Sequence, residues 1–127
     1  MSGEFSMHVF VYGTLRRGGA NDINRLEPPP QWVGVSQVPG RLFSLGDYPA
    51  IELGRWGIVV GEVYAISPAL EEALDRIEGI APSPDGQYQK DWISVAMGPQ
   101  SLTCLIYVAT PETLAHATPM GTGDWMS

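Results

Sequence analysis

Residues 9–15, Val-Phe-Val-Tyr-Gly-Thr-Leu, are the stretch of this chain that decides the fold. The apolar run Val9-Phe10-Val11 predicts a buried β-strand, and Gly13 ends it shortly afterwards. Backbone N–H groups beyond a strand end have no ladder partner, and a glycine lets a ligand approach them because it has no Cβ. Consecutive free N–H groups form a concave anion site, called a nest. A plain strand-to-loop turn is the alternative that this segment alone leaves open.

Length and composition describe one soluble globular domain. A chain of 127 residues, 44% of them hydrophobic and 17% charged, can bury a substantial core, so we expect a single domain over residues 1–127 with residues 1–7 as a flexible N-terminus. Residues 1–7 do not read as a signal peptide, and no apolar run is long enough for a membrane span. The net charge of −7 argues against nucleic acid or an anionic membrane as a partner.

The metal- and redox-active residue types are sparse. Cys104 is the one cysteine, so no intrachain disulfide can form, and a reducing, cytoplasmic location is expected. Its apolar neighbours predict a buried thiol rather than a nucleophile. His8 and His116 have no further ligands at metal-binding spacing, so we expect no metal site.

The pattern along the chain predicts mostly strands with one clear helix. Ser67 is a good N-cap, Pro68 suits the first helical position, and Gly79 suits the end of a helix, which predicts a helix over residues 68–77. A short helix is expected near residues 22–26, turns at 55–57 and 98–101, and loops at 47–50 and 80–87. The expected strands cover residues 32–38, 41–45, 58–66, 88–97 and 102–110, with a bend or bulge at 39–40.

Glu78 is the strongest candidate for chemistry. It lies in the last turn of the predicted helix, at the edge of the apolar stripe, where partial burial and the helix dipole both raise a carboxylate's pKa. Such a group is a usable general base near neutral pH. A solvated glutamate at a helix end is the plainer alternative. Glu71 on the same side is expected on the surface, and Asp75 with Arg76 as a surface pair.

Taken in order, several segments resemble the γ-glutamylcyclotransferase-like family. The resemblance covers residues 8–125, and the closing Gly123-Asp124-Trp125 is similar to a small bacterial branch of it. The matching segments are Tyr12-Gly13-Thr14-Leu15-Arg16, Gly40-Arg41-Leu42, Tyr48-Pro49-Ala50, Val60-Gly61-Glu62-Val63-Tyr64, Leu74-Asp75-x-x-Glu78-Gly79 and Tyr88-x-Lys90.

The resemblance implies an α+β fold: a small β-barrel of mixed parallel and antiparallel strands with one or two packed helices. It also implies that Tyr12, Gly13, Thr14, Leu15 and Tyr88 bind a small-molecule γ-glutamyl substrate. Glu78 would be the general acid/base in its cyclisation to 5-oxoproline, with no cofactor.

Two alternatives remain open at this point: a non-catalytic binding member of the same fold, and a hydrolase that uses water. The Pro-rich loop at residues 81–87 departs from the family pattern and leaves the substrate open. The leaving amine and the oligomeric state are also open.

Overall fold

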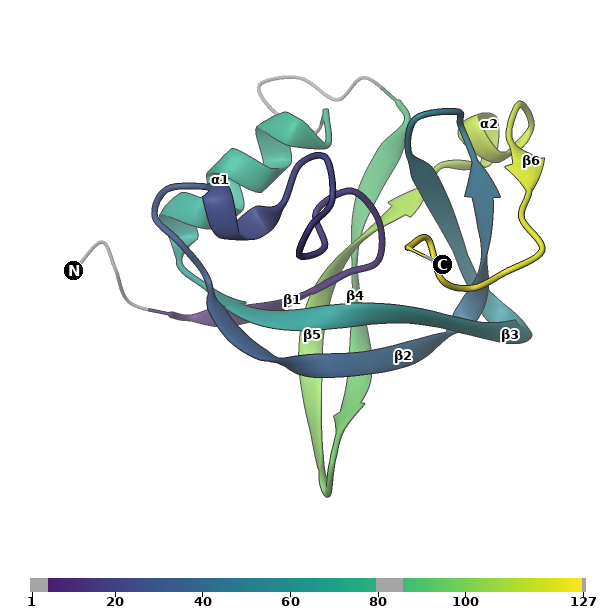
Figure 1. The fold of residues 1–127 in the computed structure, drawn as a ribbon. Coiled ribbons are helices and arrows are strands. Elements are labelled where there is room, and N and C mark those ends of the chain that lie inside the picture. Colours follow the sequence, from purple (N-terminus) through teal and green to yellow (C-terminus); the bar gives the residue numbers. More distant parts are fainter. Residues whose placement is uncertain (1–4, 80–85, 127) are drawn as a thin grey trace.

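The computed structural model describes residues 5–79 and 86–126, so the part of the expected Pro-rich loop at residues 80–85 lies outside it. Figure 1 shows a strongly curved sheet with α1 packed on one side of it. The elements are β1 (Met7–Val11), the 3₁₀ helix η1 (Ile23–Arg25), β2 (Gln31–Ser44), β3 (Pro49–Ile66), α1 (Pro68–Ile77), β4 (Tyr88–Met97), β5 (Gln100–Ala109), α2 (Pro111–Leu114) and β6 (Thr118–Pro119).

The described strands form one six-stranded mixed sheet in the order β4-β5-β1-β3-β2-β6. β1 pairs parallel with β5, and all other neighbours pair antiparallel. Three strands separate β2 from β4, yet Ser36 on β2 donates a hydrogen bond of 2.6 Å to the carbonyl of Ala96 on β4. The sheet must therefore curl on itself, and the predicted α+β class with a barrel-like mixed sheet is confirmed.

β1 is buried on both faces, which explains its unbroken apolar sequence. Val9 and Val11 belong to a core cluster that includes Leu70 and Leu74 of α1. Phe10, the intervening residue, belongs to a second cluster formed with β2, β3 and β5. Because side chains alternate along a strand, the two clusters lie on opposite faces of β1.

Local sequence signals predicted α1 and the β4–β5 hairpin correctly. The hydroxyl of Ser67 caps α1 by accepting from the N–H of Leu70 at 3.2 Å. Gly79 follows the helix with a φ of 72°, a conformation that favours glycine. Met97 pairs with Gln100, which leaves a two-residue turn in which Gly98 has a φ of 60°.

The expected turn at residues 55–57 is wrong in form, because β3 continues through it. Gly40 pairs with Leu53 while the preceding Pro39 pairs with Ile58, so residues 54–57 bulge out of the ladder. The Trp56 ring lies 4.0 Å from the guanidinium of Arg41, which holds this bulge against β2.

Several elements begin earlier than the sequence predicted. A flexible N-terminus was expected over residues 1–7, of which residues 1–4 lie outside the described residues; the N–H of Ser6 donates to the carbonyl of Ile66, and β1 begins at Met7. β3 begins at Pro49, inside the loop expected at residues 47–50. The sequence analysis did not predict α2 or β6, which lie in the last segment of the chain.

Candidate active site

A cavity of about 310 Å³ lies where β1 ends, and all six predicted site residues line it. Tyr12, Gly13, Thr14 and Leu15 come from the loop after β1, Glu78 from the end of α1, and Tyr88 from the start of β4. The other lining residues are Phe10, Val11, Ala20, Asn21, Asp47, Tyr48, Pro49, Ile77, Gln87 and Tyr107. The fold thus brings together predicted site residues, Tyr12 and Tyr88, that are 76 positions apart in the sequence.

In the loop after β1, the carbonyl groups of residues 13–15 accept hydrogen bonds, whereas the N–H groups of the same residues donate none to the described residues. The carbonyls of Gly13, Thr14 and Leu15 accept from the N–H groups of Arg16, Asn21 and Ile23 at 2.9–3.0 Å. Among the described residues, no hydrogen bond engages the N–H groups of residues 13–15. Residues 13–15 line the cavity, so their three successive N–H groups are the candidate donors for an anion-binding nest there.

Glycine is needed at position 13 for a different reason from the one that the sequence predicted. A Cβ at this position would lie 2.5 Å from Cγ and 2.8 Å from Cδ of Pro49, so the proline ring occupies the space that the sequence analysis left for a ligand. The φ of Gly13 is not in the left-handed region. Glycine is therefore needed here for the close approach of β3 to the loop.

Glu78 is half-buried at the C-terminal end of α1, where its N–H donates to the carbonyl of Leu74 at 2.9 Å. Burial raises the pKa of the Tyr12 hydroxyl well above its ordinary value, and the charge of Glu78 adds to that effect. The pKa of Tyr107 is raised mainly by burial and by Asp75, with a smaller effect from Glu78. The Glu78 carboxylate is thus close enough to both hydroxyls to act on them electrostatically.

Tyrosine hydroxyls around the cavity are held by backbone and side-chain acceptors. Tyr12 donates to the carbonyl of Tyr107 at 2.6 Å, and Tyr88 donates to the carbonyl of Pro49 at 2.7 Å. The Tyr48 hydroxyl donates to Gln87 at 3.2 Å. Because the Tyr88 proton is used in this way, its hydroxyl can interact with a further group only as an acceptor.

A cluster behind the cavity fixes the helix that carries Glu78. Asp75 accepts from the Tyr107 hydroxyl at 2.7 Å and from Lys90 at 3.2 Å, while Glu71 accepts from Lys90 at 2.5 Å. These bonds tie α1 to β4 and β5. The predicted surface pair of Asp75 with Arg76 and the predicted surface position of Glu71 are wrong. The signal missed was the spacing of residues 71, 75 and 78, which places three carboxylates on neighbouring helix positions.

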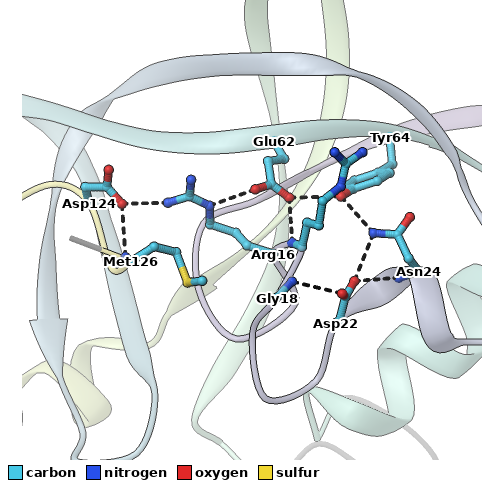
Figure 2. Close-up of polar contacts among 9 residues, drawn as sticks. Arg16, Gly18, Asp22, Asn24, Glu62, Tyr64, Asp124 and Met126 are labelled. Atoms are coloured by element: carbon cyan, nitrogen blue, oxygen red, sulfur yellow. Dashed lines mark hydrogen bonds and ion pairs between the residues drawn. The ribbon is translucent and has the colours of Figure 1, made fainter.

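A buried ion pair anchors the far end of the loop (Figure 2). Nε of Arg16 donates to Glu62 at 3.1 Å, and both side chains are about nine-tenths buried. The other Glu62 oxygen accepts from the N–H of Arg17 at 2.8 Å and from the Tyr64 hydroxyl at 2.9 Å. The buried carboxylate of Glu62 on β3 thus has its charged partner, Arg16, in the loop after β1.

The described ranges, 5–79 and 86–126, contain no group of three side chains arranged to hold a metal ion. None of the helices in those ranges has the length and apolar character of a membrane span.

The curled mixed sheet, with a cavity at the end of β1, agrees with what comparison finds. Residues 9–127 match the family described as gamma-glutamyl cyclotransferase, AIG2-like, and the chain belongs to that family.

Relatives support the assignment over most of the chain. A Vibrio cholerae relative, named as a putative gamma-glutamylcyclotransferase, is 30% identical in an alignment of 125 residues that covers 92% of this chain and 93% of the Vibrio protein. Rat gamma-glutamylaminecyclotransferase is 31% identical over 120 residues, covering 79% of this chain and 76% of the rat protein.

Solved structures share the fold. An AIG2-like protein from mouse superposes with a TM-score of 0.76 at 24% identity, over 95% of this chain and 90% of the mouse chain. YkqA from Bacillus subtilis superposes with a TM-score of 0.71 at 25% identity over 94% of this chain, but this chain spans only 39% of YkqA.

Proposed function

We propose that this protein is an enzyme that cyclises a γ-glutamyl amine or amide to 5-oxoproline and releases the amine, with Glu78 as general acid/base. One observation carries the proposal: Glu78 lines the same cavity as residues 13–15, whose N–H groups make no hydrogen bond among the described residues. In the proposed mechanism, Glu78 is the base and these N–H groups are the anion site of one cavity of about 310 Å³. The names of the Vibrio and rat relatives support the same reaction class.

The reaction needs a base and a positioned chain, but no external nucleophile. Glu78 takes a proton from the α-ammonium of the γ-glutamyl group, and the free amine attacks the γ-carbonyl carbon of the same group. The C–N bond to the leaving amine then breaks as Glu78 returns its proton to that nitrogen. The ring nitrogen gives up its second proton to the released amine, so the products are 5-oxoproline and an ammonium ion. Because the ring closes within one molecule, holding the glutamyl chain curled supplies much of the acceleration.

The N–H groups of Gly13, Thr14 and Leu15 supply the electrostatic part of this mechanism. They can bind the α-carboxylate or the oxyanion that develops on the γ-carbonyl. The Tyr88 hydroxyl, which donates to Pro49, can accept from the α-ammonium and orient it toward Glu78. The half-buried position of Glu78 limits the water that reaches the reacting atoms.

The test is the product formed from a γ-glutamyl amine. We expect 5-oxoproline with wild type and a loss of about 10²–10⁴ in rate for Glu78→Gln, because the amide keeps the shape but accepts no proton. The matched control is Glu72→Gln, which removes a carboxylate from the exposed side of the same helix. Glu71 is a poorer control than the sequence implied, because it binds Lys90.

Three results would contradict the proposal. Free glutamate as the product would mean that water is the nucleophile, as in the hydrolase alternative. Binding of 5-oxoproline without turnover of any γ-glutamyl amine would favour the non-catalytic alternative. Wild-type rates in Glu78→Gln would remove Glu78 from its role as the base.

A further inference from the structure

The C-terminal segment Gly123-Asp124-Trp125 folds back onto the body of the protein. The carbonyl of Gly123 accepts from the N–H of Val60 on β3 at 2.8 Å. A Cβ on Gly123 would lie within bonding distance of the Ile58 carbonyl, so only glycine allows this backbone contact. Trp125 packs against the core cluster that contains Phe10. Figure 1 shows this segment, in yellow, returning beside β2 and β3.

This segment delivers a carboxylate to the loop that lines the cavity. Asp124 accepts from Nη1 of Arg16 at 2.7 Å, while Nε of the same guanidinium bonds to Glu62. Figure 2 shows the Arg16 side chain lying between the two carboxylates. Asp124 also accepts from the N–H of Met126 at 3.0 Å, which orients its side chain. Arginine bound by two carboxylates is held in direction as well as in position.

Arg16 immediately follows the three N–H groups of the proposed anion site. Its own N–H donates to the carbonyl of Gly13 at 3.0 Å, so residues 13–16 form one hydrogen-bonded turn. A shift of Arg16 therefore moves the peptide units that carry the N–H groups of Thr14 and Leu15. Since hydrogen-bond strength falls steeply with misalignment, the orientation of this turn decides how well the N–H groups meet a carboxylate.

We propose that Asp124 is a positioning residue for the anion site: through Arg16 it holds the turn of residues 13–16 in the orientation that binds the α-carboxylate of a γ-glutamyl group. The inference rests on the proposed function and adds to it a role for the Gly123-Asp124-Trp125 segment. Asp124 does not line the cavity, so it acts through Arg16 and not on the substrate.

Replacing Asp124 tests this role without leaving an unpaired buried charge, because Arg16 and Glu62 still form a buried ion pair. Arg16 keeps Glu62, and the Asp124 side chain is 34% exposed, so no buried charge loses its last partner when Asp124 is replaced. Asp124→Ala removes the acceptor for both Arg16 and Met126. Asp124→Asn keeps a neutral acceptor and is the conservative variant. Glu112→Ala, at an exposed carboxylate on α2, is the control.

The measurements are the dissociation constant for 5-oxoproline, by calorimetry, and steady-state kinetics with a γ-glutamyl amine. We expect Asp124→Ala to raise the dissociation constant and KM about tenfold while kcat changes less than about threefold, because carboxylate binding is shared by substrate and transition state. Asp124→Asn should lie between wild type and Asp124→Ala, and Glu112→Ala should match wild type. If Asp124→Ala melts within the assay range, Asp124→Asn is compared with wild type in its place.

The outcomes distinguish failure of the positioning role of Asp124 from failure of the proposed function. Wild type that binds 5-oxoproline while the Asp124 variants bind it equally well overturns the positioning role alone. A fall in kcat at constant KM also overturns it, because the effect would then lie in the chemical step. Wild type that neither binds 5-oxoproline nor turns over a γ-glutamyl amine overturns the proposed function, and this inference with it.

Discussion

Replacing Gly13 by alanine adds one methyl group at a place where the structure has no room. The new Cβ would lie 2.5 Å from Cγ of Pro49, whereas ordinary contact begins near 3.4 Å, so the loop and β3 must separate by about 0.9 Å. Pro49 is buried, its ring has little freedom, and its carbonyl accepts from Tyr88. Overpacking of this kind costs about 1–3 kcal/mol.

We therefore expect Gly13→Ala to lower the melting temperature by about 3–15 °C for a domain of this length. The assay is thermal unfolding followed by circular dichroism. Gly121→Ala is the matched control, because nothing lies within 4 Å of its added Cβ and its backbone is not in the left-handed region. That control should be neutral or slightly stabilised, since alanine restricts the unfolded chain.

The same pair of variants tests the ligand site. A ligand at 100 times its dissociation constant stabilises the protein by about 2.7 kcal/mol. Wild type and Gly121→Ala should show that gain with 5-oxoproline, and Gly13→Ala should show less, because residues 13–15 move with the strain. The reasoning is refuted if Gly13→Ala melts with the control and gains as much from the ligand, since Pro49 would then yield freely and the loop would not bind the anion.

Three further predictions concern buried or paired groups. Glu62→Gln should lower the free energy of unfolding by about 3 kcal/mol, because it removes one partner of a buried ion pair from Arg16; urea unfolding beside Glu112→Gln measures it, and a loss below about 1 kcal/mol would contradict it. Arg16 lowers the pKa of Asp124 below its usual 3.8, so Asp124 contributes stability that is present above that pH and lost as the pH falls through the folded-state pKa; the stability difference between wild type and Asp124→Asn should shrink as the pH is lowered below 3.8, and a difference that stays constant would refute it. Burial raises the pKa of the Cys104 thiol to about 11, so a disulfide reagent near pH 8 should label it only after unfolding, and rapid labelling of native protein would show that it is accessible.

Local signals in the sequence predicted the elements whose ends are set locally. α1 begins at a serine cap and ends before a glycine, and both features act within one turn of the helix. The bulge at residues 54–57 has the sequence of a turn, and its stabilising contact, Trp56 on Arg41, comes from another strand and so cannot be predicted locally.

The candidate site could likewise be predicted only in part from the sequence. The cavity lining followed from the family resemblance, because Tyr12 to Leu15, Glu78 and Tyr88 lie in the matching segments. The supporting groups could not be predicted in this way. Asp75 looked like a surface residue because the sequence does not show that Tyr107 and Lys90 meet it across β4 and β5. The sequence around Gly13 predicts open space for a ligand, because it does not show that the fold brings Pro49 against this glycine.

The contact between Arg16 and Asp124 joins residues that are synthesised at different times. Their hydrogen bond spans 108 positions, and translation adds about 5–20 residues per second, so Asp124 is made roughly 5–20 s after Arg16. Glu62 is made in between and can bind the guanidinium first. The nascent chain thus passes through a stage at which Glu62 can already bind Arg16 but Asp124 has not yet been made. On the proposed role of Asp124, the anion site reaches its full affinity only after Asp124 has been made and bound to Arg16.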